Sequence, residues 1–93
     1  MRTISKEELA KIVERHGKWL RGEDGGERAN LAEADLRRAD LTGADLTGAR
    51  MGGSWLIGAD LSGVNLRETD LSMACLSRAD LTGADLTGST LSG

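Results

Sequence analysis

The sequence of 93 residues contains no proline, phenylalanine or tyrosine, and it has only two tryptophans, one histidine and one cysteine. Because aromatic side chains are so rare, the core must be built from small and aliphatic residues. The single cysteine, Cys75, has no partner in the chain for an internal disulfide. No apolar run is long enough for a membrane span, and no charged start followed by an apolar run marks a secretory signal. We therefore expect a single domain in a reducing cytoplasm.

A strong excess of charge is also missing. Lys and Arg number 12 against 15 Asp and Glu, a net charge of -3, so we expect no direct nucleic-acid binding and no membrane binding. The charge is unevenly distributed, however. Residues 1–28 carry seven basic and six acidic side chains (+1), whereas residues 29–93 carry five and nine (-4). This change in composition divides the chain into two segments at residue 28.

The first segment is predicted to form an amphipathic capping helix followed by a loop. Ser5 and Glu8 have the spacing of a capping box, and Gly22 is a suitable helix stop. Because an isolated helix of about 16 residues is marginal in water, its apolar face must lie on the rest of the chain. We expect Trp19 to be buried there and His16 to lie at the boundary of that face. The predicted cap-helix residues recur at spacings of three and four: Leu9, Ile12, Val13, Trp19 and Leu20.

The second segment consists of thirteen five-residue units without insertion. The first place is Ala in nine units and otherwise Ser, Val or Thr, and the fifth place is Gly in eight units. The third place forms a predicted core ladder: Leu31, Leu36, Leu41, Leu46, Met51, Leu56, Leu61, Leu66, Leu71, Leu76, Leu81, Leu86 and Leu91.

A period of five fits neither regular element. On an α-helix five residues rotate the chain by about 500°, so the leucines would form no stripe. On a straight strand an odd period alternates faces. The pattern is satisfied if the chain bends once per unit, with the first and third places inward and the fifth at a corner where φ > 0 suits glycine. A chain that bends repeatedly in one sense closes into stacked coils that pair as parallel strands, so the sequence predicts an all-β solenoid.

The units ADLTG and ADLSG are similar to the consensus A(D/N)LXX of the pentapeptide-repeat family, and the resemblance covers residues 29–93. It implies a right-handed quadrilateral parallel β-helix with four units per coil, or 13/4 = 3.25 coils for thirteen units, with one N-terminal capping α-helix. The stretch from Leu9 through His16 and Trp19 to GEDGGERANL resembles the leader segment of some bacterial and phage members.

If four units make a coil, outward side chains twenty positions apart stack in columns. Some members of the family are DNA mimics that bind bacterial type II topoisomerases, so the resemblance implies an alternative function as a modulator of such an enzyme, for example gyrase. The other interpretation is that Asp is simply the preferred solvent-facing residue of the unit. The candidate acidic face consists of Asp40, Asp60, Asp80, Asp45 and Asp85.

Two further surfaces are candidates for protein contacts. Where the repeat is least regular, Trp55, Ile57, Met73 and Cys75 are predicted to converge on one side, and exposed Trp is a strong interface anchor. The alternative is that the Trp55 ring lies flat and covers its own neighbours. The last coil is also expected to expose Leu86 and Leu91. A homodimer could form through that open coil or through the Trp55 side, or the chain could be a fragment of a longer protein.

Catalytic motifs are absent from the sequence. One histidine and one cysteine cannot supply a His/Cys metal set, and the glycines follow the repeat rather than a phosphate-binding loop. No base accompanies the Ser and Thr residues in a catalytic pattern. We therefore expect no enzyme activity, cofactor or metal, and predict a structural or protein-binding module with an unidentified protein partner.

Overall fold

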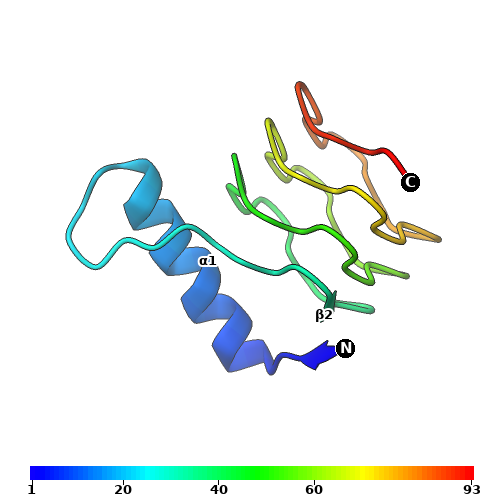
Figure 1. The fold of residues 1–93 in the computed structure, drawn as a ribbon, viewed down its shortest axis with the longest axis horizontal. Helices are drawn as coiled ribbons and strands as arrows, with labels where there is room; N and C mark the ends of the chain where they lie inside the picture. The colour runs from blue at the N-terminus through cyan, green and yellow to red at the C-terminus, as the bar shows by residue number, and fades with distance from the viewer.

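The computed structural model describes all 93 residues and contains one helix and very little regular strand. Strand β1 is Arg2–Thr3, helix α1 is Lys6–Leu20 and strand β2 is Ala34–Asp35, and β1 pairs with β2 in parallel. In Figure 1 the helix lies at one end of a stack of bent loops, and the C-terminus lies at the opposite end. No helix has the length and hydrophobicity needed to cross a lipid bilayer.

Parallel bridges join the repeats, always between residues twenty positions apart. Nine such isolated bridges occur, all at the second place of the unit, as between Asp40 and Asp60. After each bridge the chain turns, because the N–H of the next first place donates to the C=O of the preceding third place, as Ala39 does to Leu36 at 3.0 Å. The predicted parallel pairing therefore takes the form of single bridges, since a bend in every unit leaves room for only one paired residue.

The corners between bridges have positive φ at the fifth place of every unit. Eight of these places are glycines, where φ > 0 has no steric cost. The remaining five have φ between 55° and 60° and are Glu33, Arg38, Glu68, Met73 and Arg78. A turn with positive φ only at its third residue resembles a type II turn. Position in the repeat therefore determines the backbone conformation even where the residue type disfavours it.

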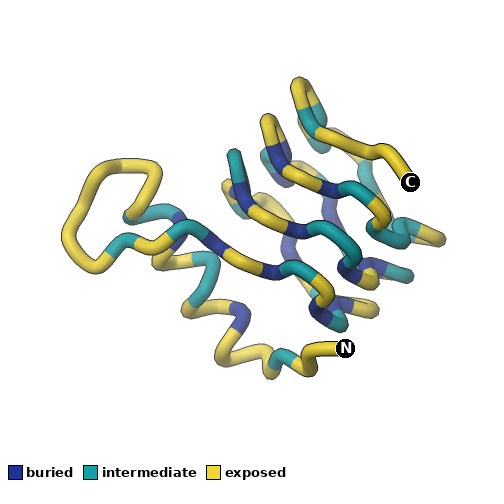
Figure 2. The backbone as a smooth tube through the Cα atoms, in the orientation of Figure 1, coloured by how far each residue is buried: buried dark blue, intermediate teal, exposed yellow.

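The third-place side chains point into the coils and form the core. Leu31, Leu46 and Leu66 are fully buried, and the remaining third-place residues up to Leu71 are at most 3% exposed. The next three leucines are only partly buried, and Leu91 is 52% exposed. No coil of this chain lies over these last residues, and Figure 2 shows the exposed backbone at that end.

Helix α1 closes the other end of the core. The Ser5 side chain caps the helix by accepting a hydrogen bond of 3.1 Å from the Glu8 N–H, as the capping-box spacing predicts. Leu9 is buried, and Ile12 and Val13 are partly buried and packed against the core. The apolar face of the helix therefore supplies the surface that the first coil would otherwise expose to water.

The prediction that Trp19 and Leu20 are buried under the coil is wrong. Trp19 is 41% exposed and Leu20 is 37% exposed, whereas His16, which we expected at the boundary, is fully buried. The reason is the hydrogen bonding of the imidazole: Nδ1 accepts from the Ala29 N–H at 2.9 Å, and Nε2 donates to the Thr47 carbonyl at 2.8 Å. A side chain that satisfies two backbone groups is favoured at this buried position over a larger apolar ring.

Candidate protein-interaction surfaces

Trp19 covers the junction between helix and coil from outside. Its ring centroid lies 5.2 Å from that of His16, and the Arg28 guanidinium carbon lies 5.8 Å from the Trp19 ring. Arg28 in turn donates from Nε to the Gly48 carbonyl at 2.6 Å. These contacts give Trp19 a role in the junction. The spacing of the helix face could not distinguish His16 from its apolar neighbours, because the partners of His16 come from distant units.

The four side chains of the Trp55 surface (Trp55, Ile57, Met73 and Cys75) differ in their exposure. Trp55 is 39% exposed and Met73 is 73% exposed, while Ile57 and Cys75 are partly buried. Trp55 and Cys75 are bridge partners and hence neighbours on adjacent coils. Exposed Trp and Met side chains are typical of protein interfaces, where they supply a large apolar contact area.

One face of the Trp55 ring is covered by an arginine. The Arg37 guanidinium carbon lies 5.2 Å from the ring centroid. The same guanidinium donates to both carboxylate oxygens of Asp35, at 2.9 and 2.8 Å. These side-chain hydrogen bonds lower the pKa of Asp35 to about 2. Asp35 therefore restrains Arg37, and Arg37 restrains Trp55, so the ring is held in place while part of it remains accessible.

Cys75 is a free thiol at the edge of this surface. The backbone N–H of Ser77 is the main cause of a lowered pKa for the Cys75 thiol, and the Ser77 hydroxyl, 3.6 Å from Sγ, adds to the effect. No group of three or more His, Cys, Asp or Glu side chains is arranged to hold a metal ion.

Bridges place the acidic face in two columns. Asp40, Asp60 and Asp80 follow one another through direct bridges, while Asp45 and Asp85 are separated by Asn65. In every unit of the acidic face, Oδ1 accepts from the backbone N–H and the hydroxyl of the Ser or Thr two residues later. The hydroxyl hydrogen bond is the larger cause of a lowered pKa in four of these carboxyls: Asp40, Asp60, Asp80 and Asp85.

Positive and neutral side chains interrupt the acidic face. Asn65 occupies one place in the second column. Arg67 forms an ion pair with Asp85, with 3.9 Å between Nε and Oδ2. Lys6 is close enough to Asp40 to contribute to its lowered pKa. Each carboxylate also closes its own turn through the Ser or Thr hydrogen bonds, so these Asp residues have a structural role whether or not a partner binds them.

The comparisons with known proteins agree with this architecture. The family model for pentapeptide repeats matches residues 27–54, 46–83 and 56–93, with eight copies. A pentapeptide repeat protein from the thylakoid lumen of Arabidopsis thaliana has a similar structure, with 41% identity over 71% of this chain and a TM-score of 0.69. No curated protein has a sequence that matches the chain.

Two cyanobacterial pentapeptide repeat proteins are also similar. Rfr23 from Cyanothece 51142 has 36% identity over 67% of this chain, with a TM-score of 0.65. HetL from Nostoc sp. strain PCC 7120, which is involved in regulation of heterocyst differentiation, has 38% identity over 69% of this chain, with a TM-score of 0.67. The matched regions make up only 46%, 43% and 30% of the plant protein, Rfr23 and HetL respectively. The chain belongs to the pentapeptide-repeat family, whose members form right-handed β-helices.

Proposed function

We propose that the chain is a non-catalytic protein-binding module that contacts its partner through the Trp55 surface. The observation that carries this proposal is the exposure of Trp55, which remains 39% accessible although Arg37 covers one face of its ring. A restrained, partly exposed Trp loses little conformational entropy on binding. Pentapeptide-repeat proteins are generally structural or binding modules, which also favours this class of function.

We further propose that the repeats form a quadrilateral solenoid of 13/4 = 3.25 coils. We also propose that the protein is located in the cytoplasm. The twenty-residue offset of the bridges supports four units per coil, and the free thiol of Cys75 is consistent with a reducing compartment. A second copy of the chain is a candidate partner, through either the Trp55 surface or the coil that exposes Leu91. Leu91 is 52% exposed, and burial of such a side chain would favour association.

The test compares Trp55→Ser with Trp19→Ser, because the two tryptophans are 39% and 41% exposed and differ mainly in position. We expect both substitutions to lower the urea midpoint slightly, because each removes a half-buried ring, but only Trp55→Ser to weaken self-association in sedimentation experiments or retention of a host partner. Trp19→Ser should leave association intact. If neither variant alters self-association or partner retention, the Trp55 surface is not an interface.

Modulation of a type II topoisomerase is a second candidate function. Asp40, Asp60 and Asp80 stack through bridges, and the hydrogen bonds that lower their pKa keep them ionised at neutral pH. Such a column could imitate the phosphates of one nucleic-acid strand. A gyrase supercoiling assay tests this function, and Asp60→Asn should reduce any effect. Absence of an effect at micromolar protein would exclude it.

A further inference from the structure

Adjacent coils are joined by a regular set of backbone hydrogen bonds. On the side that contains Asp40, the Asp60 N–H donates to the Ala39 carbonyl at 2.9 Å, and the Leu41 N–H donates to the Asp60 carbonyl at 2.9 Å. The Gly43 N–H donates to the next coil at 3.0 Å. The edge of the first coil that faces away from the second coil, here called the first edge, can be paired in this way only if another segment supplies the hydrogen-bond partners. That edge presents, on each side, the N–H and C=O of the second place and the C=O of the fourth place.

Three sides of this first edge have partners from the N-terminal segment. Arg2 donates to the Asn30 carbonyl at 2.9 Å and to the Ala32 carbonyl at 3.0 Å. On the second side, β1 pairs with β2. On the fourth side, His16 donates to the Thr47 carbonyl at 2.8 Å, while the N–H and C=O of Asp45 have no partner within the chain. The N-terminal segment therefore covers the edge unevenly.

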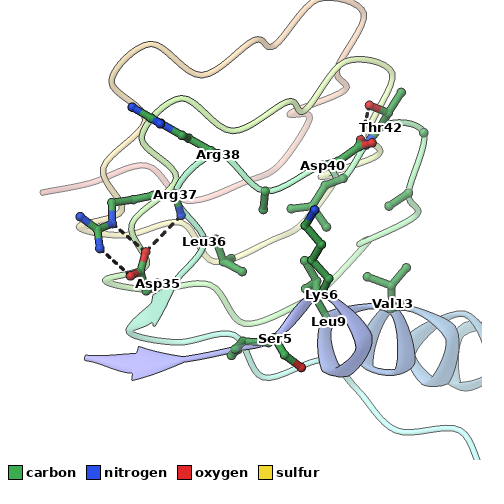
Figure 3. A pocket seen from close by; sticks show the side chains of 16 residues that line it. Ser5, Lys6, Leu9, Val13, Asp35, Leu36, Arg37, Arg38, Asp40 and Thr42 are labelled. Carbon is green, nitrogen blue, oxygen red and sulfur yellow. Dashed lines mark hydrogen bonds and ion pairs between the residues drawn. The ribbon is translucent and has the colours of Figure 1, made fainter.

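The third side, residues 39–43, has no such partner. The N–H and C=O of Asp40 and the C=O of Thr42 make no hydrogen bond within the chain. These groups line a groove of about 590 Å³ between the coil and the first half of α1, which Figure 3 shows from close by. An unpaired edge of this kind is a template for strand addition.

The groove has an apolar floor and a charged rim, in which the cations of Lys6, Arg37 and Arg38 outnumber the carboxylates of Asp35 and Asp40. Leu9 and Val13 from the helix and Leu41 from the coil line it. Lys6 and Arg38 also line it, and neither makes a salt bridge within the chain. The floor suits an aliphatic side chain, and the rim favours an acidic one.

On the second side of the first edge, strand β1 shows how an extended segment pairs with this edge. Arg2 lies opposite Ala34 and Thr3 lies opposite Asp35 in a parallel pair. Ile4 follows them at the position that corresponds to the third place of a repeat, and it is packed against the core. A short strand with an aliphatic residue two places after its first paired residue therefore fits the first edge.

We propose that the groove binds an extended peptide segment of a partner protein, which adds as a parallel strand beside Ala39–Gly43. Its N–H groups donate to the carbonyls of Asp40 and Thr42, and one of its carbonyls accepts from the Asp40 N–H. A small residue, an acidic residue and an aliphatic residue follow in that order, with the aliphatic side chain on Leu9 and Leu41. This inference rests on the proposed function only in its class, a protein-binding module. Trp55 itself does not line the groove, although Asp35 and Arg37, which restrain the Trp55 ring, do.

The test uses a blocked peptide of sequence Ala-Asp-Leu-Thr-Gly, which repeats the commonest unit of the chain, and the amide NMR spectrum of the full chain. We expect saturable shifts of the Asp40, Thr42 and Gly43 amides. Methylation of the peptide's leucine nitrogen should weaken binding about tenfold, because it removes one strand hydrogen bond. Ala10→Trp should also weaken binding about tenfold by filling the groove, since Ala10 is an exposed lining residue.

Glu14→Trp is the matched control, because Glu14 is exposed on the same helix and does not line the groove. Peptide binding that survives Glu14→Trp and Trp55→Ser but not Ala10→Trp supports strand addition in the groove. Absence of saturable shifts at millimolar peptide, or equal affinity for the methylated peptide, would overturn it. Shifts of the same amides on concentrating the protein without peptide would assign the groove to a second copy and would overturn it too.

Discussion

His16 and Ala29 are joined by a hydrogen bond of 2.9 Å from the Ala29 N–H to the imidazole Nδ1. Because a backbone N–H can only donate, Nδ1 is the acceptor and the ring proton is on Nε2, which donates to the Thr47 carbonyl at 2.8 Å. One fully buried side chain thus connects the helix to the beginning and to the end of the first coil. We therefore expect the attachment of α1 to the coil to depend on this residue more than on the tryptophan beside it.

Replacement of His16 by Ala should therefore reduce the free energy of unfolding by about 3 kcal/mol. The change removes buried volume and leaves the Ala29 N–H and the Thr47 carbonyl without their partner. His16→Phe should reduce the free energy of unfolding by about 2 kcal/mol, because phenylalanine fills the volume that alanine leaves empty but makes neither hydrogen bond. Urea unfolding of each variant measures these differences.

Trp19→Ala is the comparison for that experiment. The ring is 41% exposed, so we expect its loss to cost about 1 kcal/mol, well below the cost expected for a buried ring. A larger loss for Trp19→Ala than for His16→Ala would show that the tryptophan, and not the histidine, holds the helix on the coil.

The five-residue spacing was sufficient to predict the inward leucines and the bend at each fifth place, because both follow from local geometry repeated along the chain. It could not predict the role of His16, since the groups that His16 binds belong to units 13 and 31 residues away. The groove beside Asp40 was missed for a similar reason. Which backbone groups of the first edge stay unpaired depends on the path of the N-terminal segment across it, and no repeat encodes that path.

The corners allow a test of backbone strain. Gly43 has φ of +70° and no heavy atom within 4 Å of an added Cβ, so Gly43→Ala introduces only the cost of the left-handed conformation. We expect a loss of about 1 kcal/mol in the free energy of unfolding. Arg78 is a residue with a side chain that already has a positive φ, of 59°, so Arg78→Gly should relieve this strain. We expect the free energy of unfolding to rise by about 0.5 kcal/mol. If the natural chain, Gly43→Ala and Arg78→Gly have equal midpoints in thermal unfolding, a side chain at the fifth place causes no backbone strain.

Acid should destabilise the fold through the aspartates. The carboxyls of Asp35 and Asp60 have a pKa below the ordinary value of about 4, because Arg37 and Ser62 hydrogen-bond to them. A lowered folded-state pKa stabilises the fold above the unfolded value, and this stabilisation is lost as pH falls, for Asp35 through about 2. We expect the urea midpoint to fall between pH 5 and pH 2.

Asp60→Asn separates the charge from the hydrogen bond. Asn65 already occupies the same place in another unit and accepts the Arg67 N–H at 3.1 Å, so an amide can close the turn. The variant should fold at pH 7 and lose less stability than the natural chain on acidification. Asp24→Asn, in the exposed loop after α1, is the control. A midpoint that stays constant from pH 7 to pH 2 in the natural chain would contradict this origin of acid sensitivity.

Ser54 and Thr69 occupy the same first place of their units and are both fully buried, yet only one hydroxyl has a partner. Thr69 donates to the Leu46 carbonyl at 2.8 Å, whereas the Ser54 hydroxyl has no hydrogen-bond partner. Ser54→Ala should therefore gain about 1 kcal/mol in the free energy of unfolding, since it removes an unpaired buried hydroxyl. Thr69→Val should lose about 1 kcal/mol with its volume unchanged. If urea unfolding shows a loss for Ser54→Ala, that hydroxyl has a hydrogen-bond partner in solution, and the assignment of Ser54 as an unsatisfied buried group is wrong.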